Sequence, residues 1–304
     1  MWSLLKFQFP ELLSQYRLDK FKPATSFTKS KADNLSAFDT KLPVKPEVEQ
    51  DDLPWTPVCD LEATHPVVRY LSRRGVDVLE DFFFTPTWRE LANKVAVDPP
   101  FSAAAMFYDK PRIVTRIMKE GVLQGIIGRA IAKDDNPRYM IIKAREDATM
   151  VFNFDNVDLT EQVFIAEGVY DSVILSNSVG QLGLTKKADV EEIPNRVWCL
   201  DNQPRSADVV KNLEELISTG ESVVLWNRLP GYLQQYKDLN SMFVDGGASK
   251  KFLDNYVRNN VYCGEAAKVE LNEWAKVSSR KQFTSSKLNA LEKFKLGHRR
   301  FASE

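Results

Sequence analysis

The chain has 304 residues, of which 43% are hydrophobic and 27% charged, and its formal net charge is −1. This composition is typical of a globular protein with one large or two modest cores, and it excludes nucleic-acid binding through a global positive charge. Three cysteines without paired spacing and two histidines argue against a zinc site in the chain and give no sign of disulfides. The apolar opening is interrupted by Lys6, Pro10 and Glu11, so it is too short for a membrane span.

The first 58 residues are predicted to form a helix and a tether. Residues 2–21 have the pattern of a short amphipathic helix that is broken at Pro10. Residues 22–58 carry five prolines among Ser, Thr, Lys and Asp. Such a segment buries little apolar surface, which favours an extended tether.

Residues 59–160 are predicted to form a small, basic, mixed α/β subdomain. One helix should begin after His65-Pro66, and a second short helix should follow before residue 84. Residues 112–133 alternate apolar and polar side chains around Glu120-Gly121, which predicts a β-hairpin, and a further strand follows at 138–143.

Residues 161–262 show a different pattern, in which continuous apolar strands alternate with amphipathic helices. Strands are predicted at 163–167, 196–201 and 222–227, and helices at 170–178, 207–218, 239–246 and 249–260. This alternation is typical of the α/β class, with a parallel sheet covered by helices on both faces. The final residues, 263–304, are predicted to form a charged tail with one more helical stretch.

Three successive predicted strands are followed by a loop that carries a carboxylate, namely Glu167, Asp201 and Asp238. Ligands of open parallel sheets bind at the carboxyl ends of the strands, where these residues should converge. Carboxylates that lie close together raise each other's pKa unless a cation lies between them, and their oxygens suit magnesium or manganese. A merely solvated sheet edge is the alternative, and Asp171, in a first helical turn, has the alternative role of complementing the helix dipole.

Residues 109–145 form a local basic segment, with nine Lys or Arg side chains against four acids. Because the net charge of the whole chain is close to zero, this segment is the candidate surface for binding phosphate groups. Alternating charges on a solvated hairpin are the alternative.

Five motifs, in order, resemble those of Toprim-type DNA primases across roughly residues 60–262. They are YLSRRGV, GRAIAKDDNPRYM, AEGVYDS at an EG-x-x-D motif, LDNQPRS at a D-x-D motif, and KDLN at a later acidic pair. The segments HPVVRYL, GQLGL and RVWCLDN are most similar to the branch of this family found in T-even-like bacteriophages.

The resemblance implies a Toprim fold and the synthesis of short RNA primers on single-stranded DNA from nucleoside triphosphates. It also implies Mg²⁺ or Mn²⁺ as cofactor, a hexameric replicative helicase as partner, and the cytoplasm of an infected bacterium as location. By motif, the catalytic residues would be Glu167, Asp201 and Asp238. The metal ligands would be drawn from Glu167, Asp171, Asp201, Gln203, Asp238 and Asn240. Nucleotide or DNA would be bound by Arg74, Arg129, Lys133, Arg138, Tyr139 and Lys143.

The chain departs from the family pattern in two places. Such primases begin with a zinc-binding domain, and Met1-Trp2-Ser3 resembles the sequence just beyond it, so we expect that module to be separate or missing. Gln203 stands where the family carries an acid, which removes one negative charge from the predicted metal site.

Two other functions therefore stay open. One is another Toprim enzyme, such as a topoisomerase or nuclease, and the other is a degenerate Toprim protein that binds DNA or helicase without catalysis. Residues 276–304, with eight Lys or Arg against two acids, are predicted to contact the helicase, with a solvated terminus as the alternative.

Overall fold

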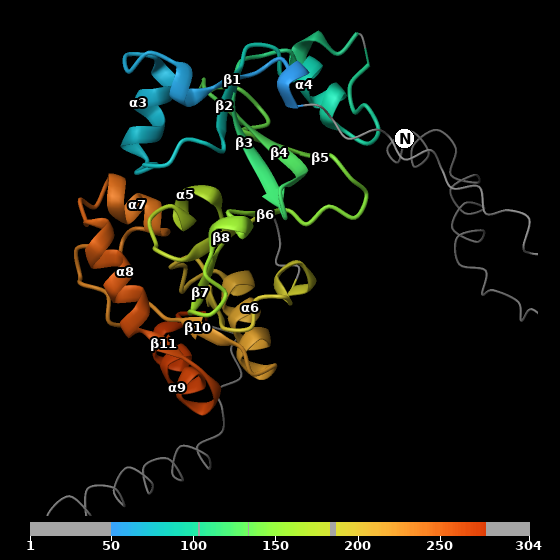
Figure 1. Cartoon of the computed structure of the whole chain (residues 1–304). Helices are drawn as coiled ribbons and strands as arrows, with labels where there is room; N and C mark the ends of the chain where they lie inside the picture. The colour runs from blue at the N-terminus through green and yellow to red at the C-terminus, as the bar shows by residue number, and fades with distance from the viewer. Residues whose placement is uncertain (1–49, 103, 133, 183–186, 278–304) are drawn as a thin grey trace, which may run out of the picture. The chain divides into compact units, whose positions relative to one another are not determined.

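A computed structural model of the chain describes residues 50–102, 104–132, 134–182 and 187–277 (Figure 1). The predicted helix at 2–21, most of the predicted tether and the basic tail lie outside these residues. The described residues form one antiparallel sheet and one mixed sheet, each with helices packed against it. No helix in the described ranges is long and apolar enough to cross a membrane.

The first sheet is antiparallel throughout, with its strands in the order β1-β2-β3-β4-β5. Its strands are β1 (Thr56–Pro57), β2 (Phe82–Thr85), β3 (Arg112–Lys119), β4 (Val122–Ala130) and β5 (Tyr139–Lys143). The predicted hairpin is confirmed, because β3 and β4 are joined by a turn in which Glu120 and Gly121 have positive φ angles of 52° and 72°. The Asp155 carboxylate accepts hydrogen bonds from both of these backbone N–H groups.

Two helices and three short 3₁₀ turns accompany this sheet. They are η1 (Gln50–Asp52), η2 (Val58–Asp60), α3 (Pro66–Arg73), α4 (Trp88–Val95) and η3 (Met106–Tyr108). The predicted second helix before residue 84 is wrong, because strand β2 begins there. Phe82 and Phe83 point to opposite faces of the sheet and join different apolar clusters, which is the alternation of a strand buried on both faces.

The end of the predicted tether belongs to this fold. Leu53 and Val58 are buried, and Thr56 of β1 pairs with Phe84 of β2. The predicted boundary at residue 58 therefore lies too late, because residues 50–58 contribute to the sheet and its core.

The second sheet has the order β11-β10-β9-β7-β8-β6. Its strands are β6 (Val151–Phe152), β7 (Val163–Ala166), β8 (Ser178–Gln181), β9 (Arg196–Cys199), β10 (Ser222–Val224) and β11 (Val261–Tyr262). The four inner strands are parallel, and the two edge strands run antiparallel to them. The predicted parallel sheet is confirmed, although the sequence pattern did not predict β6, β8 or β11.

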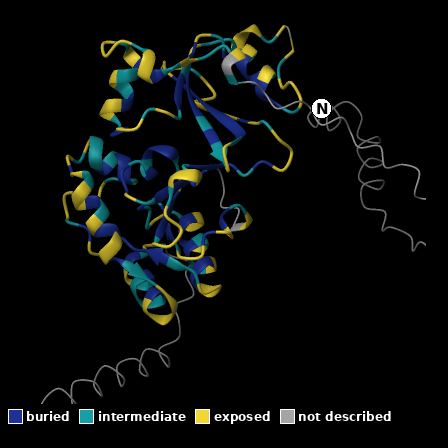
Figure 2. Cartoon of the chain, viewed as in Figure 1, coloured by how far each residue is buried: buried dark blue, intermediate teal, exposed yellow. Residues whose placement is uncertain are grey.

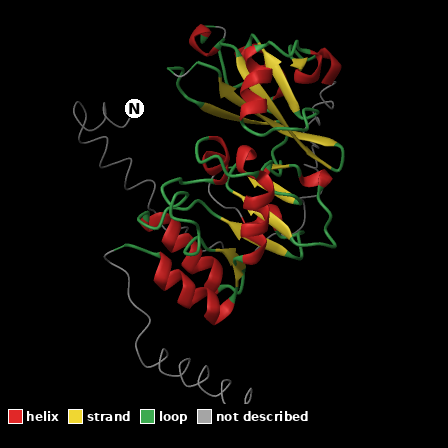
Figure 3. Ribbon diagram, turned by 90° about the vertical axis from the view of Figure 1, so that its left-hand side faces the viewer, coloured by secondary structure: helices red, strands yellow, loops and turns green. Residues whose placement is uncertain are grey.

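Helices cover both faces of the second sheet, with α7 and α8 on one side of it and α6 on the other (Figures 1 and 3). The helices are α5 (Val169–Ser172), α6 (Ala207–Ser218), α7 (Leu239–Val244), α8 (Lys250–Asn259) and α9 (Gly264–Trp274), with the 3₁₀ turns η4 (Phe154–Asn156) and η5 (Lys187–Val190). Figure 2 shows the strands of this sheet as its buried interior. α6 begins where the Ser206 side chain caps the Val209 N–H, and its apolar stripe faces the core.

α9 corrects the predicted start of the tail at residue 263. Its residues Ala267, Leu271 and Trp274 are buried in the same core as the sheet. The folded region therefore continues at least to Trp274.

The strand order places a topological switch point at β7. The chain passes from β7 to β8 on one side and then crosses to β9 on the other side of β7. In open α/β sheets the crevice beyond the carboxyl ends of two such strands is where ligands bind. The residues that follow β7 and β9 therefore define the candidate site.

Candidate active site

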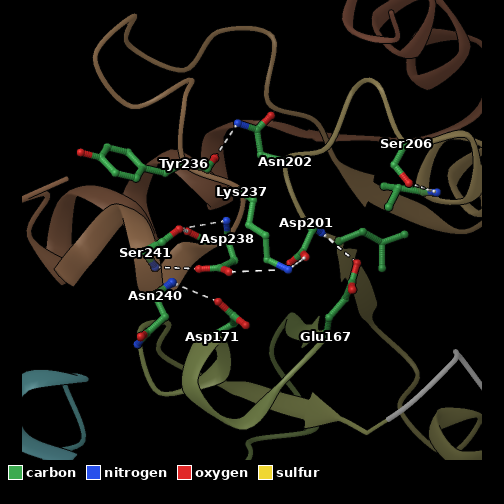
Figure 4. Close-up of polar contacts among 12 residues, drawn as sticks. Glu167, Asp171, Asp201, Asn202, Ser206, Tyr236, Lys237, Asp238, Asn240 and Ser241 are labelled. Atoms are coloured by element: carbon green, nitrogen blue, oxygen red, sulfur yellow. Dashed lines mark hydrogen bonds and ion pairs between the residues drawn. The ribbon is translucent and has the colours of Figure 1, made fainter. Parts of the chain in front are cut away.

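The two central strands deliver Glu167 and Asp201 to the same edge of the sheet. Glu167 directly follows β7, and Asp201 lies two residues after β9. Glu167 Oε1 accepts a hydrogen bond from the Asp201 backbone N–H at 2.9 Å. This hydrogen bond holds one carboxylate oxygen of Glu167 beside Asp201 (Figure 4).

The other two acids, Asp171 of α5 and Asp238, both bond to the backbone at the start of helix α7. Asp238 is its N-cap, and Asp238 Oδ1 accepts from the Ser241 N–H at 2.7 Å while Ser241 Oγ accepts from the Asp238 N–H at 3.2 Å. The Asn240 N–H donates to Asp171 Oδ1 at 3.0 Å. Asp171 and Asp238 are therefore held at the same short helix start, as Figure 4 shows.

A lysine that the sequence analysis did not single out lies among these acids. Lys237 Nζ is 3.1 Å from Asp201 Oδ2 and 4.0 Å from Asp238 Oδ2. The sequence signal that could have found Lys237 is its position directly before the predicted Asp238. A cation next to a predicted acid can neutralise the negative charge of the site.

Asn202 is a second residue that sequence reasoning missed. Its backbone N–H donates to Lys237 O at 2.5 Å, and its side chain donates to Tyr236 O at 3.0 Å. Its own Oδ1 accepts from Trp274 Nε1 at 3.2 Å. Asn202 therefore ties the loop that carries Lys237 and Asp238 to the end of β9 and to helix α9.

The acids carry surplus negative charge. Burial, followed by the nearby Asp238 carboxylate, raises the pKa of Asp171 to about 8. Burial and the Glu167 carboxylate raise the pKa of Asp201 to about 6, against the opposing effect of Lys237. These shifts mean that the site gains free energy from a cation, and four carboxylates make a hard oxygen donor set that suits a divalent ion.

The four carboxylates could hold a magnesium ion, although they are not drawn together around a metal position. Within the described ranges, no three His, Cys, Asp or Glu side chains already have metal-binding geometry. Glu167, Asp171 and Asp201 each have one carboxylate oxygen engaged by a protein donor, and the second oxygen of each has no such partner among the described residues.

These acids form one wall of a cavity of about 480 Å³. Basic and aromatic side chains of the antiparallel sheet and of α3 form the opposite wall, with Arg74, Arg129, Arg138 and Tyr139 among them. The structure thus brings together nine of the twelve residues predicted for the site, counting Asn240.

Arg129 is a buried cation without a carboxylate partner among the described residues. It is 5% exposed, and its guanidinium lies 4.7 Å from the ring centroid of Tyr139 and 5.0 and 5.1 Å from those of Tyr70 and Tyr170. Burial lowers its pKa. The positive charge of this buried guanidinium is stabilised only by aromatic rings. Binding an anion there would provide the missing counter-charge.

Arg74 reaches the cavity because of the way helix α3 ends. Gly75 has a φ of 78°, and a Cβ at this position would lie 2.9 Å from the Phe243 ring of α7. The glycine therefore allows a tight helix end against α7, where Arg74 Nη1 donates to Asn240 Oδ1 at 2.5 Å. This is the physical reason for Arg-Gly at the end of the YLSRRGV motif.

Asn240 was predicted to be a metal ligand, but its side chain bonds to other protein groups. It is buried, its Oδ1 accepts from Arg74, and its Nδ2 donates to Arg74 O at 2.7 Å and to Tyr170 O at 3.0 Å. Because both ends of its amide group are used, Asn240 positions α3 against α7 and does not present an oxygen to a metal.

Three other predicted residues are not brought to the cavity. Gln203 lines a separate depression of about 330 Å³, on the other side of Glu167. Lys143 lies farther along β5 and lines another depression with Arg145. Lys133 lies outside the described residues.

The predicted basic segment is largely neutralised within the fold. Arg112 is buried and donates to Gly128 O and Pro137 O. Four more of its cations have carboxylate partners, in the pairs Lys110–Asp135, Arg116–Asp81, Lys119–Glu192 and Arg145–Asp147. The local charge excess therefore overstates the free positive surface, and Arg129 and Arg138 are the cations of this segment that line the cavity.

The known proteins to which the chain is similar are DNA primases. No family model matches the chain. The chain is similar to a DNA primase, with 31% identity over 223 residues, which cover 71% of this chain and 62% of that protein. This relative is the DNA primase of Enterobacteria phage T4. The predicted resemblance to Toprim-type primases of T-even-like phages is confirmed, over a span that is less than two thirds of the relative's length.

Solved primase structures also match. The Aquifex aeolicus primase (zinc-binding and RNA polymerase domains) has 18% identity, coverage of 64% of this chain and 56% of that chain, and a TM-score of 0.46. The RNA polymerase domain of Mycobacterium tuberculosis primase DnaG, in complex with DNA, has 11% identity, coverage of 70% and 77%, and a TM-score of 0.49.

Proposed function

We propose that the chain catalyses the metal-dependent synthesis of short RNA primers on single-stranded DNA, from nucleoside triphosphates. The observation that carries this proposal is a single cavity with four carboxylates on one wall and three arginines on the other. Carboxylates bind the metal that a triphosphate requires, and arginines bind the phosphate groups themselves. A nucleotidyl transfer site needs both at once.

The acids have distinct roles in this proposal. Asp201 and Asp238, with Asp171 behind them, would be metal ligands. A bound magnesium ion would supply charge neutralisation for the triphosphate and activation of the primer-end hydroxyl. Glu167 is oriented through one oxygen by the Asp201 N–H, which leaves its other oxygen to bind the metal or to accept the hydroxyl proton.

The opposite wall would bind the substrates. Arg129 is already desolvated and stacked on tyrosine rings, so binding a phosphate there costs little additional burial of charge. Arg74 and Arg138 line the same cavity and add positive charge to it. Tyr139 is 46% exposed and presents a ring on which a template base can stack.

Primer synthesis from labelled ribonucleoside triphosphates on single-stranded DNA tests the proposal. Glu167→Gln should lower the rate of dinucleotide formation by about 10²-fold or more, because it removes a group that acts on the reacting atoms. Glu161→Gln is the matched control, since this exposed acid lies at the opposite end of β7. Equal rates in the wild type and Glu167→Gln would refute the assignment.

The arginine wall has its own test. Arg129→Ala and Arg138→Ala should weaken triphosphate or single-strand binding, and the loss should shrink as the salt concentration rises. Lys143→Ala, on the same strand as Tyr139 but outside the cavity, is the control with the same change of charge. Normal binding by both arginine variants at low salt would show that Arg129 and Arg138 do not bind triphosphate or single-stranded DNA.

The second candidate is a degenerate Toprim protein that binds DNA or helicase without catalysis. The lack of metal-binding geometry among the described acids favours it, and the four carboxylates that line one cavity oppose it. DNA binding without dinucleotide formation, under conditions where Mn²⁺ binds, would establish this alternative. The proposed partners are the template, a hexameric helicase and a separate zinc-binding module, and adding the last two to the purified chain should stimulate priming.

A further inference from the structure

The Lys237 ammonium group lies beside both Asp201 and Asp238, two of the acids that would hold a divalent ion. It lies 3.1 Å from Asp201 Oδ2 and 4.0 Å from Asp238 Oδ2. A divalent ion held by the same two carboxylate oxygens would therefore require the ammonium group to move away.

The structure allows this movement of the ammonium while the rest of the residue stays in place. The Lys237 carbonyl accepts the 2.5 Å hydrogen bond from the Asn202 N–H, which fixes the backbone beside Asp201. The Lys237 side chain is 58% exposed, whereas the side chains of Asp201 and Asp238 are 11% and 21% exposed. The cation is thus the mobile partner of two well-held anions.

We propose that Lys237 is a built-in competitor of the metal. It holds Asp201 and Asp238 together by charge when no metal is bound, and the divalent ion must displace it. This inference rests on the proposed metal site and goes beyond it, because it assigns to this chain's own lysine the control of metal affinity. It also accounts for four carboxylates that share one cavity without metal-binding geometry.

Mn²⁺ binding to the full chain, without nucleotide or DNA, tests the proposal by electron paramagnetic resonance of the free ion. Lys237→Met should lower the Kd for Mn²⁺ by about three- to tenfold, because it removes the competing cation and retains the length of the side chain. Lys237→Arg, which retains the charge, should keep a Kd close to that of the wild type. In EDTA, Lys237→Met should also unfold at a lower temperature than the wild type, because its acids lose their counter-cation.

Two controls separate this inference from the proposed function. Wild-type binding that Asp201→Asn does not weaken, or no binding at all, would overturn the metal site and the lysine inference together. Wild-type binding that Asp201→Asn weakens, with an unchanged or higher Kd in Lys237→Met, would overturn the lysine inference alone. Because the Lys237 side chain is largely exposed, far-ultraviolet circular dichroism should show the same fold in both lysine variants.

Discussion

Arg74 Nη1 and Asn240 Oδ1 form a 2.5 Å hydrogen bond between residues that are 166 positions apart in the sequence. Arg74 belongs to the basic wall of the cavity, and Asn240 lies on helix α7, whose start holds Asp171 and Asp238. One buried amide group therefore fixes the distance between the two walls.

Asn240→Ala should separate a positioning role from a metal-ligand role. The substitution leaves Arg74 O and Tyr170 O without their donor, which should lower the free energy of unfolding by about 1–3 kcal/mol. It should raise the KM for nucleoside triphosphate and leave the Kd for Mn²⁺ unchanged, as measured by steady-state kinetics and paramagnetic resonance. Asn255→Ala, on the exposed face of α8, is the control. Weaker Mn²⁺ binding in Asn240→Ala would make Asn240 a ligand after all.

Asp171 should make stability and metal binding depend on pH. Its pKa is about 8 in the folded chain, against an ordinary value of 3.8. Between these values the folded state holds a proton that the unfolded state has lost, so stability should fall as the pH rises from 4 to 8. At the proposed site Mg²⁺ would have to displace this proton, and the increase in Tm on adding Mg²⁺ should therefore be larger at pH 8.5 than at pH 6.

Asp171→Asn is the variant that checks this prediction by thermal unfolding. It should reduce the difference between the two Mg²⁺-induced Tm shifts, whereas Asp98→Asn, an exposed acid elsewhere, should not change it. The same Mg²⁺-induced shift at both pH values in the wild type would show that Asp171 does not exchange a proton for the metal.

The parts of the fold that the sequence predicted are those with strong local periodicity. The apolar strands β7 and β9 and the amphipathic helix α6 could be read directly. β8 could not, because its Gly180 has low strand propensity. The structure gives the reason for this glycine, since a Cβ there would lie 3.0 Å from the backbone of Gly168 beside the site.

The site was predicted where a residue's position follows from the topology, and not where it depends on tertiary partners. Glu167 and Asp201 converge because parallel strands end at one edge. Arg112 counted toward the basic segment, yet it is buried, which no local pattern reveals. Lys237 and Asn202 were missed because their importance lies in contacts with the predicted acids and with α9.

Gly128 should be required for the close packing of β4 against Trp88. A Cβ at residue 128 would lie 2.4 Å from the Trp88 ring, which is fully buried. Gly128→Ala should lower the free energy of unfolding by about 1–3 kcal/mol through overpacking, as measured by urea denaturation. Gly231→Ala is the control, because nothing lies within 4 Å of the added Cβ there and its φ is not positive. Equal stability of the two variants would show that the Trp88 ring relaxes without cost.

The C-terminal region should divide into a structural part and a part that serves a partner. Trp274 of α9 is buried and donates to Asn202, so a chain that ends at residue 263 loses both a core element and a support of the Lys237–Asp238 loop. Removal of residues 264–304 should therefore abolish cooperative unfolding and dinucleotide formation.

Removal of residues 278–304 alone should keep Tm and unstimulated dinucleotide formation close to those of the full chain. It should reduce helicase-stimulated priming, because it removes seven of the eight basic side chains in 276–304. Thermal unfolding and primer assays with and without helicase measure these outcomes on the two truncations side by side. Equal stimulation of the full chain and of the chain that ends at residue 277 would place the helicase contact elsewhere in the protein.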